Sequence, residues 1–183
     1  MASGPNDSSR QINRAPSPII ARTVPWLVIM LGSILQTLPL IASAPLLPPF
    51  GFLFLLAWRQ LRPGLLPVWA GLPLGLVDDL FSGQPMGSAM LLWSLAMIGM
   101  EMIEQRFPWR SYLLDWAVAA GIVSAYLVLA SVIAYPGSSS AGVAPHVGVL
   151  APQLLLSVLL FPAVERIIAL ADRLRLSRFR VLG

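Results

Sequence analysis

Acidic side chains inside long apolar runs are the residues of this chain that could carry out chemistry or recognition. Asp78 and Asp79 lie near the end of an apolar run that starts at Leu65, and Asp115 lies at the start of a later one. An ionisable residue inside a membrane-spanning helix is by default a functional hypothesis. Two interpretations of the Asp78 and Asp79 pair stay open. Either they form a recognition site, or one caps the neighbouring turn and the other faces lipid headgroups. At Asp115 a negative charge favours the helix dipole.

Enzymatic chemistry finds no support in these residues. An aspartyl protease needs two carboxylates close enough to share a proton, whereas Asp79 is expected near the outer face of a membrane and Asp115 at its inner face. The chain has no cysteine, and all twelve basic residues are arginine, which excludes thiolate and lysine chemistry. His146, the only histidine, stands in an uncharged segment that we predict to be a loop. We therefore predict no enzyme, no metal site and no cofactor.

Small residues recur at a spacing of four around the aspartates. Gly71, Gly75, Asp79 and Gly83 would form one row on a helix, with Asp78 beside it. Small side chains on one row let a second backbone approach closely. Pro73 in the same run predicts a kink, because proline removes a backbone hydrogen bond.

The composition points to a bilayer environment. Of the 183 residues, 57% are hydrophobic and only 11% are charged, against roughly 45–50% apolar residues in ordinary soluble domains. The net charge of +4 comes from arginines that punctuate the apolar runs. This pattern indicates membrane topology, and we expect no nucleic-acid partner.

Six apolar runs predict an all-α, polytopic membrane protein with six transmembrane helices. A span needs about 20 apolar residues, and the run at 46–58 is the least secure. Residues 1–23 are expected to be a disordered cytoplasmic tail, 24–171 the six-helix membrane domain and 172–183 a basic cytoplasmic tail. The six predicted spans are 24–43, 46–58, 65–81, 86–103, 112–135 and 147–170.

The arginines set the expected orientation, because positively charged loops stay on the cytoplasmic side. With both termini inside, every arginine falls on the cytoplasmic side, whereas an odd number of spans would place one terminal cluster outside. The basic tail suits an anionic membrane surface and, equally, contact with a cytoplasmic partner. The arginines expected to lie on that surface are Arg173, Arg175, Arg178 and Arg180.

Residues 75–87 read GLVDDLFSGQPMG. This segment resembles the G-L-x-x-D-x-x-x-G-x-x-x-G pattern of the rod shape-determining MreD family. On that spacing Asp79 is the family aspartate, Gly83 and Gly87 are the family glycines, and Asp78 is additional. The segment WRQLRP at 58–63 and the pair Phe161-Pro162 before a basic tail are similar to the family's pattern as well. One departure is that family members often carry an acidic residue just after the proline at position 49, where this chain has phenylalanine.

The resemblance implies a non-enzymatic scaffold of the bacterial inner membrane. Such a protein binds MreC and works with MreB, RodA and a penicillin-binding protein in cell elongation, cell shape and peptidoglycan synthesis. It also implies a fold like that of the substrate-binding subunits of vitamin-uptake (ECF-type) transporters. The alternative function is therefore a small-molecule transporter subunit with a polar pocket lined by Asp78, Asp79, Gln84 and Trp93. Under either function the membrane lipid is a further partner.

Overall fold

The computed structural model describes residues 18–36, 47–106, 111–134 and 144–176, and the regular structure in these ranges is entirely helical. One short 3-10 helix, η1, leads directly into a longer α-helix. The elements in chain order are α1 (Pro18–Leu35), α3 (Phe50–Leu61), η1 (Val68–Ala70), α4 (Gly71–Ser82), α5 (Ser88–Arg106), α6 (Tyr112–Ala134) and α7 (Ala144–Leu176).

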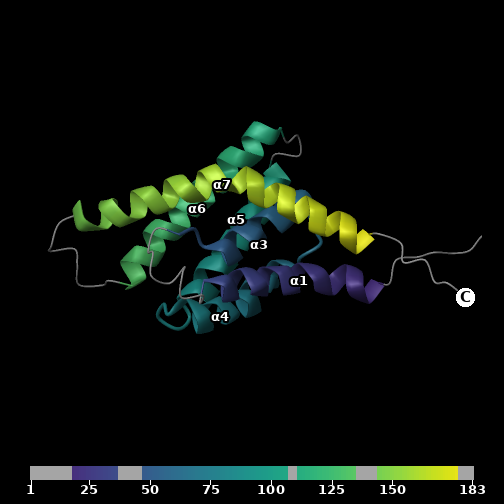
Figure 1. The fold of residues 1–183 in the computed structure, drawn as a ribbon, viewed down its shortest axis with the longest axis horizontal. Coiled ribbons are helices and arrows are strands. Elements are labelled where there is room, and N and C mark those ends of the chain that lie inside the picture. The colour runs from purple at the N-terminus through teal and green to yellow at the C-terminus, as the bar shows by residue number, and fades with distance from the viewer. Residues whose placement is uncertain (1–17, 37–46, 107–110, 135–143, 177–183) are drawn as a thin grey trace, which may run out of the picture.

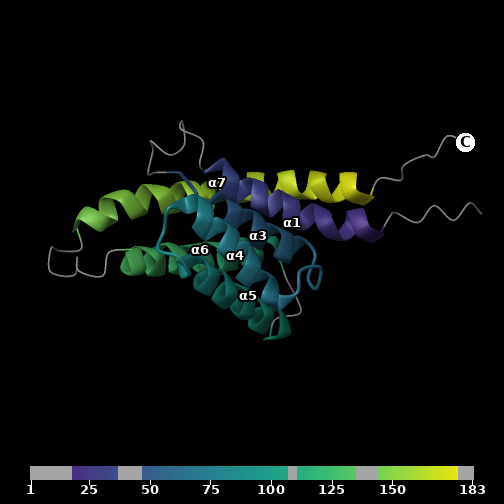
Figure 2. The ribbon, with the colours of Figure 1, turned by 90° about the horizontal axis from the view of Figure 1, so that it is seen from below.

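The helices pack as a bundle around α3. Helix α3 contacts α1, α6 and α7, while α4 packs against α5 and α1, and α6 packs against α7 and α5. The first turns of α1 and the last turns of α7 lie at the same end of the molecule (Figures 1 and 2). The two ends of the described chain therefore meet on one side.

Helix α3 is apolar on every side as far as Trp58, and this is why it takes the central position. Almost all of its side chains are buried, including Phe52 and Trp58. The Phe52 ring stacks on Tyr126 of α6, with 4.2 Å between ring centroids, and it lies 5.8 Å from Trp93 of α5. One aromatic cluster thus joins three helices.

Two helices of the described chain are long and apolar enough to cross a membrane. They cover Tyr112–Ala134 and Leu150–Leu174, and shorter apolar helices cover Arg22–Leu35 and Phe50–Leu61. At about 1.5 Å per residue, the 12 residues of α3 are shorter than a hydrocarbon core of about 30 Å. The all-helical prediction is confirmed for the described residues, whereas six membrane crossings stay a prediction.

Several helix ends differ from the predicted ones. Helix α1 begins at Pro18 rather than Val24, and α7 continues to Leu176 rather than ending near Leu170. Helix α7 also begins at Ala144, so the prediction that His146 lies in a loop is wrong. Hydropathy marks where the apolar core ends, but helical hydrogen bonding continues into the polar flanks.

The predicted kink at Pro73 is also wrong. Helix α4 begins at Gly71, so Pro73 falls in its first turn, where the backbone N–H would have no helical partner in any case. The preceding residues turn as a 3-10 helix after Pro67. The proline therefore helps to start α4 rather than to bend it.

Candidate functional site

The glycines of α4 let α5 approach very closely. A Cβ atom on Gly75 would lie 2.6 Å from Met90 Cα, and one on Gly71 would lie 2.8 Å from the backbone of Trp93 and Ser94. Real Cβ atoms do not approach backbone atoms this closely, so neither position accepts a larger residue without movement of α5. The backbone that packs against this row of small residues therefore belongs to α5 of the same chain, not to a partner protein.

The turn between α4 and α5 depends on two further glycines. Gly83 ends α4 in the left-handed conformation with φ of 68°, and Gly87 has φ of 93°. Side chains with a Cβ atom avoid these angles. Both glycines are open to added volume, since nothing lies within 4 Å of a Cβ placed on either. Their conformation, rather than close packing, requires glycine.

Asp79 caps helix α5 from the neighbouring helix. Its Oδ2 accepts hydrogen bonds from the backbone N–H groups of Gly87 (2.9 Å) and Met90 (3.2 Å), and its Oδ1 accepts from the Ala89 N–H (2.8 Å) and the Ser88 hydroxyl (3.2 Å). The first N–H groups of a helix lack intrahelical acceptors and favour negative charge. A single buried carboxylate therefore fixes the α4–α5 turn and the start of α5.

Asp78, the residue before Asp79, points to a different part of the bundle. Asp78 is buried. A Cβ atom added to Gly51 of α3 would lie 3.2 Å from Asp78 Oδ1 and would overlap Ser33 Oγ of α1, so both polar atoms lie close to this glycine. The Asp78 Oδ1 and Ser33 Oγ atoms have no hydrogen-bond partner at ordinary distance, and the same holds for the buried Tyr126 hydroxyl. Asp78 thus faces the interior where α1, α3 and α4 meet.

Apolar side chains surround the α4–α5 turn and remain exposed. Leu80, Phe81 and Met86 are all exposed, and Met86 at 72% is among the most exposed large side chains of the described residues. They flank the segment that Asp79 fixes. Together with the two glycines they form the turn surface, which consists of Leu80, Phe81, Gly83, Met86 and Gly87.

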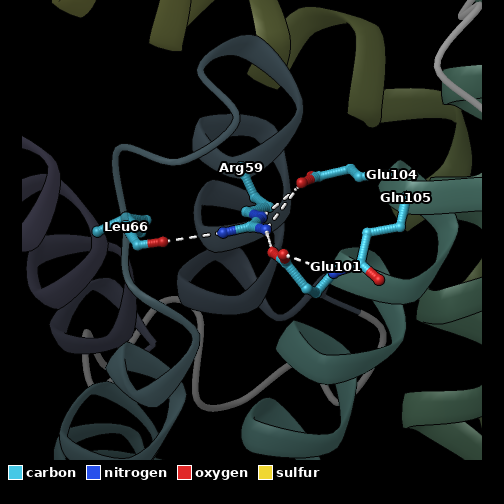
Figure 3. A network of polar contacts seen from close by, with 5 residues as sticks. All are labelled: Arg59, Leu66, Glu101, Glu104 and Gln105. Atoms are coloured by element: carbon cyan, nitrogen blue, oxygen red, sulfur yellow. Dashed lines mark hydrogen bonds and ion pairs between the residues drawn. The ribbon is translucent and has the colours of Figure 1, made fainter.

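A second polar cluster lies at the other end of α3 and α5 (Figure 3). The Arg59 side chain is only 2% exposed. It donates to Glu101 Oε2, to Glu104 Oε1 at 3.0 Å and Oε2 at 2.7 Å, and to the Leu66 carbonyl at 2.9 Å. Two carboxylates and one carbonyl therefore hold one buried guanidinium, and they tie α3 to α5 and to the segment before η1.

Further contacts at this end join α3 to α6 and α7. Arg62 pairs with Asp172 of α7 at 2.8 Å, and the Gln60 amide nitrogen donates to the Asp115 carbonyl at 2.9 Å. Asp115 lies in the first turn of α6, at the position the dipole favours. Sequence analysis singled out Asp115 for the helix dipole, but it did not select Gln60, Arg62, Asp172 or the Arg59 cluster as site residues. The available signal was an arginine at one helix end and two glutamates at another, both predicted on the same side of the membrane.

The expected surface arginines are only partly within the described structure. Arg173 is exposed on α7, and the backbone of Arg175 continues the same helix. Arg178 and Arg180 lie outside the described residues. Among the described residues, no group of three or more histidine and acidic side chains could hold a metal ion.

Comparison with known proteins identifies the family. No curated protein and no solved structure matches the chain. The family model described as rod shape-determining protein MreD matches residues 18–168. The match covers most of the chain and contains both the Asp79 turn and the Arg59 cluster. The chain therefore belongs to the rod shape-determining MreD family.

Proposed function

We propose that this protein is a non-enzymatic scaffold subunit of the bacterial cell-elongation complex, which binds MreC and so supports cell shape and peptidoglycan synthesis. MreB, RodA and a penicillin-binding protein are the other expected members of the complex. The observation that carries the proposal is the Asp79 cap. Asp79 binds three backbone N–H groups and one hydroxyl, so it fixes the turn surface without leaving a free reactive group.

The turn surface suits a protein contact. Its exposed apolar side chains, Leu80, Phe81 and Met86, lie on a segment that the Asp79 carboxylate ties to the start of α5. A preformed surface binds a partner at a lower entropic cost than a mobile one. Gly71, Gly75 and Asp78 act in this proposal as packing residues that set the position of α4, whereas Gly83 and Gly87 belong to the contact itself.

The same proposal includes six membrane crossings, with both termini in the cytoplasm of a bacterial inner membrane. The Asp79 turn and the Arg59 cluster lie at opposite ends of α5, as they would at opposite faces of a bilayer. Helix α3 is shorter than the bilayer core but is buried by its neighbours. Because a buried segment does not contact lipid, its irregular flanks are tolerated at membrane depth. On this topology Arg173 and Arg175 lie at the inner membrane surface, with Arg178 and Arg180 beyond them.

Co-purification from bacterial membranes tests the partner. The tagged full chain, an Asp79→Asn variant and an Arg173→Gln control would be purified in mild detergent, and the recovered proteins identified by mass spectrometry. We expect MreC with the wild type and with the control, and less MreC with Asp79→Asn. Full recovery of MreC with Asp79→Asn, at unchanged protein stability, would refute the role of the turn.

A substrate-binding transporter subunit is the second candidate, and one observation favours it. The buried cluster around Asp78 contains unpaired polar atoms on Ser33, Trp93 and Tyr126, as a small polar ligand would require. The expected resemblance of the fold to transporter subunits is not by itself evidence for transport, because one fold can serve many functions. Recovery of an ATPase module or a bound metabolite with the purified chain, in place of MreC, would establish this function instead.

A further inference from the structure

A surface hollow lies beside the first turns of α1. It has a volume of about 560 Å³ and is lined by Arg22, Thr23, Trp26 and Leu27. The hollow is accessible, since Arg22 and Leu27 are both exposed. The charge of Arg22 is not neutralised, because no ion pair or hydrogen bond joins its side chain to another described residue. The lining contains no carboxylate, so the hollow presents an uncompensated cation.

Two tryptophans from different parts of the chain meet about one helical turn from Arg22. The rings of Trp26 in α1 and Trp69 in η1 have centroids 5.7 Å apart, and Trp69 is 60% exposed. Neither indole N–H donates to another described residue. Trp69 follows the segment whose Leu66 carbonyl accepts from Arg59, so the pair lies at the same end of the bundle as the Arg59 cluster. Exposed tryptophans of membrane proteins gather at the level of the lipid headgroups, and the pair therefore marks the membrane surface at this end.

The order of side chains along α1 matches the order of groups along a phospholipid. Arg22 precedes Trp26 by one turn, about 6 Å along the helix axis. Beyond Trp26, the side chains of Leu27, Leu31 and Ile34 are exposed, and residues three and four apart share one side of a helix. An arginine, a tryptophan pair and an aliphatic row thus follow one another as do phosphate, glycerol and acyl chain. A carboxylate of a partner protein would use the arginine but not the aliphatic row.

We infer that this hollow binds the headgroup of an anionic glycerophospholipid, of the phosphatidylglycerol class. The Arg22 guanidinium donates to the phosphate, the indole N–H groups of Trp26 and Trp69 donate to the glycerol and ester oxygens, and the acyl chains run along Leu27 and Leu31. Arginine is well suited to this role, because its guanidinium fork matches a phosphate group. An ethanolamine headgroup fits less well, because its ammonium meets an arginine and no carboxylate. The inner leaflet as the source of the lipid rests on the proposed topology, whereas binding in detergent does not.

Native mass spectrometry of the full chain in detergent tests the site. The purified protein would be mixed with phosphatidylglycerol or phosphatidylethanolamine with identical acyl chains. We expect about tenfold greater retention of phosphatidylglycerol, from one charge-assisted hydrogen bond that the other lipid does not make as well. Similar retention of the two lipids would overturn the assignment. Displacement of the lipid by an excess of glycerol phosphate, which has no acyl chains, would also overturn it, because the site would then be one for free phosphate esters.

Matched variants assign the effect to the hollow. Arg22→Gln should lower phosphatidylglycerol retention about tenfold and leave phosphatidylethanolamine retention unchanged. Trp69→Leu should lower the retention of both lipids, because the ring contacts groups that they share. Arg106→Gln removes an exposed arginine at the end of α5, outside the hollow, and should change neither. Equal losses of phosphatidylglycerol in Arg22→Gln and Arg106→Gln would overturn the site, since general surface charge would then explain the selectivity.

Two further readouts separate this site from folding and from the proposed function. The unfolding temperature of Arg22→Gln should equal that of the wild type, because Arg22 has no partner among the described residues. MreC recovery with Arg22→Gln should also be unchanged. If the wild type selects phosphatidylglycerol but does not recover MreC, the scaffold function fails and the lipid site stands. If MreC is recovered but the two lipids are retained alike, the lipid site fails alone.

Discussion

Removing the Arg59 guanidinium should destabilise the bundle strongly. Arg59→Met keeps an apolar chain of similar length in the core but leaves Glu104, which is 14% exposed, without its buried counter-ion. Breaking one partner out of a buried ion pair costs about 3–5 kcal/mol. For a chain of this size, each kcal/mol shifts the unfolding temperature by about 2–4 °C. The unfolding temperature of the purified protein in detergent should therefore be about 6–20 °C lower in this variant than in the wild type.

Two further variants test the physical cause. Arg173→Met removes an arginine that is exposed on α7, and an exposed charge contributes only about 0–1 kcal/mol, so the unfolding temperature should barely change. Combining Arg59→Met with Glu101→Gln and Glu104→Gln should recover much of the loss, because the two negative charges that Arg59 balances are then removed together with it. A triple variant no more stable than Arg59→Met alone would refute the explanation by charge balance.

The remaining predictions concern the α4–α5 pair and the topology. Gly75→Ala should lower stability by about 1–3 kcal/mol, because the added methyl group would overlap the backbone of α5. Gly99→Ala has open space around it and should raise stability by about 0.5–1 kcal/mol. Thermal unfolding in detergent measures both changes. Asp78→Asn should raise the same unfolding temperature, since an uncharged amide is less costly to bury. Met86→Cys in intact cells should react with an impermeant maleimide and Ser111→Cys should not; the reverse pattern would invert the proposed orientation.

Hydropathy predicted the helical class and the approximate position of each apolar helix, because burial in lipid imposes continuous apolar segments. Spacing also indicated that Gly71 and Gly75 share a face with Asp79. It could not indicate which helix that face contacts. The partner proved to be α5, since the short turn through Gly83 and Gly87 returns the chain directly against α4.

The Arg59 cluster illustrates what periodicity alone cannot predict. Arg59 and Glu104 lie 45 positions apart, and nothing local distinguishes an arginine that pairs inside the bundle from one that extends to the membrane surface. The pairing depends on how α3 and α5 cross. Topology predicted only that both residues belong to the same side of the bilayer. Adjacent helical residues point about 100° apart, so the sequence could suggest that one of Asp78 and Asp79 caps the neighbouring turn, but not which one or what the other contacts.

Photo-crosslinking in rod-shaped bacteria tests the central claim most directly. A photoreactive residue would replace Met86 on the turn surface or, as a control, Leu155 of α7, which is similarly exposed at 70% against 72%. The scaffold account predicts a crosslink from position 86 to MreC that weakens when Asp79→Asn is added, and none from position 155. Crosslinking of MreC at position 155 but not at position 86 would contradict the account, because the turn surface would then not be the contact.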